Sequence, residues 1–142
     1  MLDKHFALRD RTKRFALRVL KLCDSLPKTD AGRTISRQLL RSGTSVAANY
    51  RAVGRARSQA EFVAKMGVVI EEADESEFWL ELLVDSGIIP KPRLDELTLE
   101  ANELVAIFVA SQKTAKQTST KRSRKVFCSP DLPITRSPDK EK

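Results

Sequence analysis

Four long segments of this chain place apolar or small residues at alternating steps of three and four, and this spacing constrains the fold most. Such spacing puts the residues on one face of an α-helix, where helices pack together at the shallow angle of a bundle. The expected helices span about residues 8–26, 30–55, 58–86 and 93–113. Four of the six prolines lie at or beyond Pro92, so the segments themselves contain few helix-breaking residues.

Each expected helix has one face that we assign to the core. The predicted core positions, in chain order, are Leu8, Thr12, Phe15, Val19, Leu22 and Leu26; Ile35, Leu39, Ser42, Val46, Tyr50 and Val53; Phe62, Met66, Val69, Ala73, Ser76, Leu80 and Leu83; and Leu94, Leu97, Ala101, Leu104 and Phe108. The connections at 27–29, 56–57 and 87–92 are short, and short links make neighbouring helices run antiparallel. The sequence therefore predicts an all-α, antiparallel up-down-up-down four-helix bundle over residues 1–114.

The expected helix ends carry residues that suit them. Thr29 or Asp30 can cap the second helix, and Ser58 with Glu61 forms a capping-box pattern that starts the third. Gly87 can close the third helix in a left-handed conformation. The small residues Ser42, Gly43 and Ser45 are expected to allow close helix approach.

The apolar spacing stops near Lys116, and much of the net charge of +7 lies beyond that point. From Gln112 onward there are nine Lys/Arg residues and three Asp/Glu residues. Because such a segment buries too little apolar surface to offset the entropy cost of ordering, residues 115–142 are predicted to be a disordered basic tail. The run Lys121, Arg122, Arg124 and Lys125 resembles a nucleic-acid-binding arm, although a purely solubilising tail is an equal alternative.

Several classes of function find no support in the sequence. The single histidine, His5, and the two cysteines, Cys23 and Cys128, form no metal-ligand pattern, and Cys23 is expected to be a buried free thiol. No phosphate-binding glycine loop and no nucleophile with its base is present, so we expect no cofactor, no metal and no enzymatic activity. No apolar run reaches about 18 residues and no signal peptide begins the chain, so we expect a cytoplasmic protein outside the membrane.

The second expected helix carries arginines without any acid between Ala31 and Ala60. These residues are Arg33, Arg37, Arg41, Arg51, Arg55 and Arg57. The first five share one arc of the helical wheel, opposite the core face. One interpretation is a ridge that binds phosphates. Two alternatives remain: an ordinary solvated face, or an electrostatic seam with the acidic third helix, within or between subunits.

Other residues off the core faces have predicted roles in assembly or structure. Val68, Phe78 and Leu82 lie off the main stripe of the third helix and are predicted to form a subunit interface, although a wide core face or scattered exposure would also explain them. Asn49 lies at the edge of the core face and is expected to be buried and to fix helix register through hydrogen bonds, with contact to a ligand as the alternative. Glu77 is expected to pair with an arginine of the second helix or of another subunit.

A family resemblance runs through the expected bundle. It begins with Arg41-Ser42, Ser45 and Asn49, continues with Arg57-Ser58-x-x-Glu61-Phe62, and passes through Glu75, Glu77 and Leu80 to Gly87-Ile88-Ile89. In these residues the chain resembles the bacterial four-helix bundle proteins related to the 23S ribosomal RNA intervening-sequence protein, over about residues 8–111. The resemblance implies a homopentamer and a nucleic-acid role. Some relatives are accessory proteins of retroelement reverse transcriptases.

Two functional hypotheses follow from these patterns and from the resemblance. The first is a non-enzymatic, homo-oligomeric module that binds RNA or an RNA–DNA hybrid through the arginines and the tail. The alternative is a protein-interaction scaffold, or a reverse-transcriptase accessory subunit, without nucleic-acid specificity of its own. The second hypothesis requires a protein partner for the arginine face.

Overall fold

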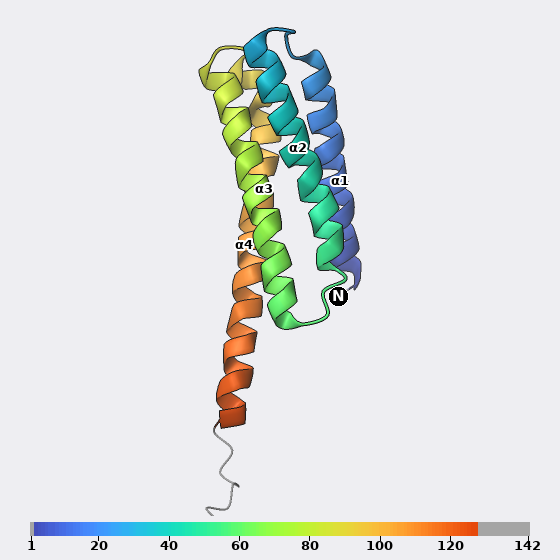
Figure 1. Ribbon diagram of the computed structural model, residues 1–142, viewed down its shortest axis with the longest axis vertical. Coiled ribbons are helices and arrows are strands. Elements are labelled where there is room, and N and C mark those ends of the chain that lie inside the picture. Colours follow the sequence, from blue (N-terminus) through green and yellow to red (C-terminus); the bar gives the residue numbers. More distant parts are fainter. Residues whose placement is uncertain (1, 128–142) are drawn as a thin grey trace, which may run out of the picture.

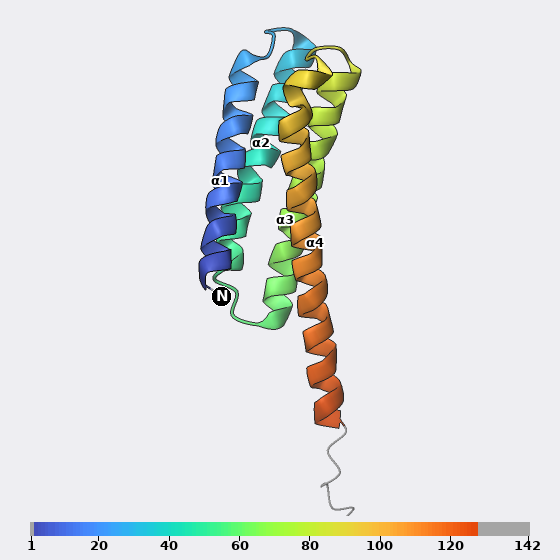
Figure 2. The ribbon, with the colours of Figure 1, turned by 180° about the vertical axis from the view of Figure 1, so that it is seen from behind.

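The computed structural model describes residues 2–127, which form four α-helices arranged as a bundle (Figure 1). The helices are α1 (Leu2–Ser25), α2 (Asp30–Val53), α3 (Gln59–Asp85) and α4 (Lys91–Phe127). Each helix packs against the next one in the chain and runs in the opposite direction. Within the described residues the backbones of α1 and α4 also approach each other over a short stretch, while the pairs α1–α3 and α2–α4 lie on the two diagonals of the bundle (Figure 2). The predicted four-helix bundle is confirmed.

The core consists of the residues that the 3-4 spacing selects. All predicted core positions are buried except Leu8, Leu22 and Phe62, which are half-buried and pack against the edge of the core. Tyr50 of α2 stacks on Phe108 of α4 with ring centroids 5.6 Å apart. This contact crosses the bundle diagonal and ties the end of α2 to the later half of α4.

Small residues set how closely the helices approach. A Cβ atom added at Gly43 would lie 2.9 Å from both methyl groups of Val19, so α1 and α2 are in contact at this level. On the other side of α2, the buried hydroxyl of Ser76 donates to the hydroxyl of Ser42 over 3.0 Å and joins α2 to α3. The expectation that Ser42 and Gly43 permit close packing is therefore confirmed.

The predicted caps begin α2 and α3. The Thr29 hydroxyl accepts the N–H of Gly32 at 3.1 Å, and the Ser58 hydroxyl accepts the N–H of Glu61 at 3.1 Å. The Glu61 carboxylate in turn accepts the N–H of Arg57 at 3.3 Å, one residue before the donor of a standard capping box. Gly87 follows α3 with a φ of 75°, as the predicted left-handed closure requires.

Two helices are longer than the sequence pattern indicated. α1 begins at Leu2 rather than near residue 8, and the half-buried ring of His5 packs beside Tyr50 there. α4 continues to Phe127, so the prediction of disorder from residue 115 is wrong for 115–127. Ala115 is buried, and its carbonyl accepts the Gln59 side-chain amide at 3.0 Å, so α3 holds α4 beyond the predicted end. The remaining predicted tail, 128–142, lies outside the described residues.

The seam between α1 and α4 is polar. The Arg11 guanidinium donates to both carboxylate oxygens of Glu100, over 2.6 and 3.0 Å, and to Glu103 over 2.6 Å. These contacts raise the pKa of Arg11, chiefly through the hydrogen bond to Glu100. Charged groups therefore close the bundle where apolar contacts are few.

Candidate nucleic-acid interface

Five arginines form an uncompensated basic surface on and beyond α2. We call this surface the basic face, and its members are Arg33, Arg37, Arg51, Arg55 and Arg57. All five are exposed, and in the described part of the chain none of their guanidinium groups has a carboxylate oxygen within 4.0 Å. Arg33 and Arg51 are about 27 Å apart along the helix at 1.5 Å per residue. The basic face is thus long, rigid and free of internal neutralisation.

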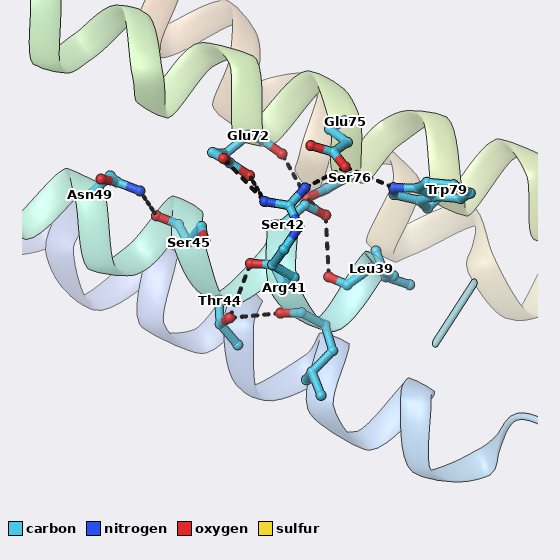
Figure 3. A network of polar contacts seen from close by, with 11 residues as sticks. Leu39, Arg41, Ser42, Thr44, Ser45, Asn49, Glu72, Glu75, Ser76 and Trp79 are labelled. Atoms are coloured by element: carbon cyan, nitrogen blue, oxygen red, sulfur yellow. Dashed lines mark hydrogen bonds and ion pairs between the residues drawn. The ribbon is translucent and has the colours of Figure 1, made fainter. Parts of the chain in front are cut away.

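Arg41 does not belong to this surface, although the helical wheel placed it there. Its guanidinium reaches across to α3, where it pairs with Glu72 at 3.3 Å and with Glu75 (Figure 3). Glu75 also accepts the indole N–H of Trp79 at 3.3 Å. The Arg41 hydrogen bond lowers the pKa of Glu75, as the indole N–H also does, so the carboxylate stays ionised. At this residue the structure shows the alternative of a seam with acidic α3, and we therefore leave Arg41 out of the basic face.

The end of α4 adds a basic arm. We define the α4 extension as residues 116–127, which continue beyond the contact of Ala115 with Gln59. Lys121, Arg122 and Arg124 are exposed on it, whereas the side chain of Lys125 lies outside the described part. The extension projects past the α2–α3 connection, at the end of the bundle that carries Arg55 and Arg57 (Figures 1 and 2). Sequence reasoning placed these cations on a disordered tail, so it missed their fixed position.

A shallow groove joins the α4 extension to the start of α3. Ser58, Gln59 and Ala60 line one wall, and Thr118, Ser119, Arg122 and Ser123 line the other. Arg57 directly precedes this groove in the chain. No acidic residue occurs between Glu103 and Asp131, so the wall formed by α4 is polar and basic. The structure thus brings Arg57 and Arg122, which are far apart in sequence, to the same end of the molecule.

Asn49 does not link two helices as expected. It is half-buried, and its side-chain amide donates to the carbonyl of Ser45 on its own helix at 2.9 Å (Figure 3). The buried polar contact between helices is made by Ser42 and Ser76 instead. The sequence assigned these two serines to the core, but the spacing could not show that they face each other.

Glu77 is half-buried on α3 without the expected arginine. Within residues 2–127 it forms no ion pair, so the predicted pairing with α2 is not made. Burial raises the pKa of Glu77, and repulsion from Asp74 and Glu81 raises it further. The folded chain therefore disfavours the ionised form of this carboxylate.

We expect the substitution Glu77→Gln to stabilise the fold at neutral pH, by less than about 1 kcal/mol because solvent screens the site. A folded-state pKa above the unfolded value makes ionisation unfavourable to folding, so stability falls as pH rises from the unfolded to the folded pKa. The variant has no ionisable group at this position, so its stability does not fall in this way. Urea unfolding at pH 7 and at pH 3.5 should show a gain only at pH 7; equal gains at both values would contradict the electrostatic explanation.

The apolar residues predicted to form a subunit interface lie outside the core. Val68 is 43% exposed and Phe78 is 52% exposed, while Leu82 is half-buried. Phe78 packs edge-on against Trp79 with ring centroids 4.9 Å apart. Val68 and Phe78 are therefore available to a partner, whereas Leu82 packs against the edge of the core.

Three further properties of the described residues bear on what they can do. Between Leu2 and Phe127 there is no group of three or more His, Cys, Asp or Glu side chains placed to hold a metal ion. In the same range no helix is long and apolar enough to cross a membrane. The buried thiol of Cys23 has a raised pKa because burial disfavours the thiolate.

Comparisons with known proteins agree on one family. The family model described as 23S rRNA-intervening sequence protein matches residues 4–110. A crystal structure of a protein of unknown function from the S23 ribosomal protein family of Bacteroides thetaiotaomicron is 32% identical, with a TM-score of 0.72; the match covers 78% of this chain and 98% of that one. The comparison with curated proteins found no match. The matched residues include the larger part of each helix and the whole basic face. The chain therefore belongs to the 23S rRNA-intervening sequence protein family.

Proposed function

We propose that the protein is a non-enzymatic, homo-oligomeric module that binds structured RNA through the basic face and the α4 extension. The observation that carries this proposal is the absence of compensating carboxylates around five exposed arginines, within the described residues. Each phosphate that an arginine neutralises releases condensed counterions, which favours binding. The planar guanidinium also offers paired donors that match phosphate oxygens.

The chemistry of these surfaces favours contacts to the backbone of the nucleic acid rather than to its bases. Single-strand binders place aromatic rings among their cations, so that bases stack on them. Here a single exposed ring, that of Phe6, lies near Arg51 in the described part of the chain, whereas Phe78 packs on Trp79, whose indole N–H is bonded to the carboxylate of Glu75, which repels a polyanion. A rigid row of arginines suits the regularly spaced phosphates of a folded RNA or an RNA–DNA hybrid. The family name, which refers to 23S rRNA, supports RNA as the partner.

The test is a titration of a fluorescent RNA hairpin with the full-length protein, followed by anisotropy at several salt concentrations. Six to eight phosphate contacts predict that the logarithm of the affinity falls with the logarithm of salt at a slope of about −4 to −7. An equally long neutral peptide-nucleic-acid hairpin is the matched control and should not bind. Absence of RNA binding at about 50 mM salt, or a slope near zero, would refute the proposal.

A second candidate function is a protein-interaction scaffold, as in an accessory subunit of a reverse transcriptase. The exposed apolar side chains of α1, α3 and α4 favour it, because such side chains in rows commonly mark protein contacts. In this case the basic face would bind an acidic protein. The RNA titration then shows no binding, while the oligomer itself persists.

A further inference from the structure

An open groove runs along the contact between α1 and α2 and shares Arg51 with the basic face. Its lining residues come from one side of each helix, at the spacing of three and four that puts side chains in a row. They are Phe6, Arg9, Asp10 and Lys13 of α1 and Thr44, Ala47, Ala48 and Arg51 of α2. The volume of the groove is about 470 Å³. Clefts that hold small organic groups have volumes of roughly 300–1,000 Å³, so a planar ring fits here.

Phe6 and Arg51 lie at the same level of the bundle. The ring Nδ1 of His5 lies 3.2 Å from the hydroxyl oxygen of Tyr50. Phe6 and Arg51 follow these two residues directly in the chain. Because Tyr50 also stacks on Phe108 in the core, the contact holds the first turns of α1 against α2. The Phe6 ring is 54% exposed, and a packed helix holds its position.

The apolar part of the groove offers one aromatic face. The small side chains of Ala47 and Ala48 leave space beside the Phe6 ring. An exposed aromatic ring next to such space can stack on another flat ring, and nucleic-acid bases have the required π-faces. In the described part of the chain Phe6 is the exposed aromatic side chain that lies beside the basic face.

The charged part of the groove is cationic. Arg9, Lys13 and Arg51 line it, and among the described side chains none of the three pairs with a carboxylate. The acid in the groove, Asp10, pairs with Arg14 at 3.1 Å. A ring that is flanked by unpaired cations suits a ligand that is flat and carries phosphate on either side.

We infer that the groove takes one unpaired nucleotide of the bound RNA, whose base stacks on Phe6 while the phosphates beside it pair with Arg51 and Arg9. The inference rests on the proposed RNA binding and names the feature of the RNA that the protein selects. Paired bases lie in the deep, narrow major groove of an RNA helix, where side chains do not reach them. A bulged base can leave the helix and stack on a protein ring. Since Arg51 belongs to both surfaces, a strand held on the basic face passes the groove.

Three RNA duplexes of equal length test this inference by anisotropy titration with the full-length protein. One is fully paired, one has a single bulged uridine, and one has the same bulge without its base. The uridine bulge should bind about 5-fold or more tightly than the abasic bulge, which is the contribution of one stacked base. The abasic strand keeps the bulge and its phosphates, so the difference measures the effect of the base. Equal affinities for the two bulges, with the paired duplex still bound, would overturn the inference and leave the proposed function intact; no binding to any duplex would refute both.

Substitutions of Phe6 assign the preference to its ring. Phe6→Ala should abolish the preference for the uridine bulge, whereas Phe6→Tyr should retain it because the phenol ring presents a similar face. The matched control is Phe78→Ala on α3, which removes the same side chain at a similar exposure of 52% and should keep the full preference. A preference that survives in Phe6→Ala, or that disappears in Phe78→Ala, contradicts the assignment.

Photochemical cross-linking locates the base independently of affinity. A 5-iodouridine at the bulge forms a covalent bond, on irradiation with ultraviolet light, with an aromatic ring that it stacks on. Trypsin cleaves after Lys4 and Arg9, so the cross-linked base should be found by mass spectrometry on the peptide of residues 5–9, which contains Phe6. A cross-link confined to any other peptide would overturn the inference.

Discussion

Replacing Arg33, Arg37, Arg51 and Arg55 together by glutamine is expected to weaken binding of the RNA hairpin about 100-fold or more at moderate salt. A net contribution of about 0.7 kcal/mol or more for each of the four charge-assisted contacts gives this magnitude. The salt dependence should flatten as well, because each lost phosphate contact removes about 0.7 to 0.9 from the slope, or about 3 for four contacts. Glutamine is a good helix former, so α2 should remain helical.

The control for this variant removes the same charge from another side of the bundle. Arg14, Arg18, Lys91 and Arg93 are exposed on α1 and at the start of α4, away from the outward side of α2. Their replacement by glutamine should leave the slope within about one unit of the wild-type value. If the control lost affinity equally, net charge rather than the basic face would govern binding, and the assignment of these arginines would be wrong.

The substitution Gly32→Ala is expected to destabilise the fold by about 3 kcal/mol, a large fraction of the stability of a small domain. A Cβ atom at this position would collide with the backbone carbonyl of Pro27, because the α1–α2 connection folds back onto the first turn of α2. A backbone atom in a short, capped turn cannot move aside as a side-chain end can. The N–H of Gly32 is also the group that the Thr29 cap holds.

Thermal and urea unfolding measure this effect, and the neighbouring residue supplies the control. Ala31→Gly changes backbone freedom in the same turn without a clash, so it should cost about 1 kcal/mol or less. By helix propensity alone Gly32→Ala would be stabilising by a similar amount. A stabilised Gly32→Ala protein would therefore show that the turn has room for a methyl group, contrary to the close approach of Pro27.

How much of the fold could be predicted depends on the apolar spacing, which records only which residues are buried. It identified the core positions of α2 and α4, such as Leu39 and Leu104, because burial requires one apolar face. It could not find the end of α4, since beyond Ala115 only Gln59 and its neighbours face the helix and the spacing has nothing to record. Helix formation persists there because no glycine or proline occurs between Pro92 and Pro130. Apolar periodicity thus indicates which residues are buried, whereas glycine and proline indicate where a helix can end.

The candidate site, too, could be predicted from the sequence only in part. A helical wheel gives the direction of a side chain around its own axis, and it placed Arg33, Arg37 and Arg51 on the outward side of α2 correctly. It does not give the height of residues on the next helix, so the sequence offered a seam with acidic α3 only as an alternative and could not say that Arg41 pairs with Glu72 and Glu75. The same lack of relative height hid the contact between Ser42 and Ser76. These relations exist only after α2 and α3 have packed.

The order in which the helices touch has a consequence for how the chain reaches its native state. Most contacts between helices join consecutive segments, α1 with α2, α2 with α3, and α3 with α4. Chains with such local topology fold within microseconds to milliseconds, since little loop-closure entropy opposes each step. We therefore expect each hairpin to form as it leaves the ribosome. The ion pairs of Arg11 with Glu100 and Glu103 join α1 to α4, which are far apart in sequence. We expect these ion pairs to form late and to hold the two helices together.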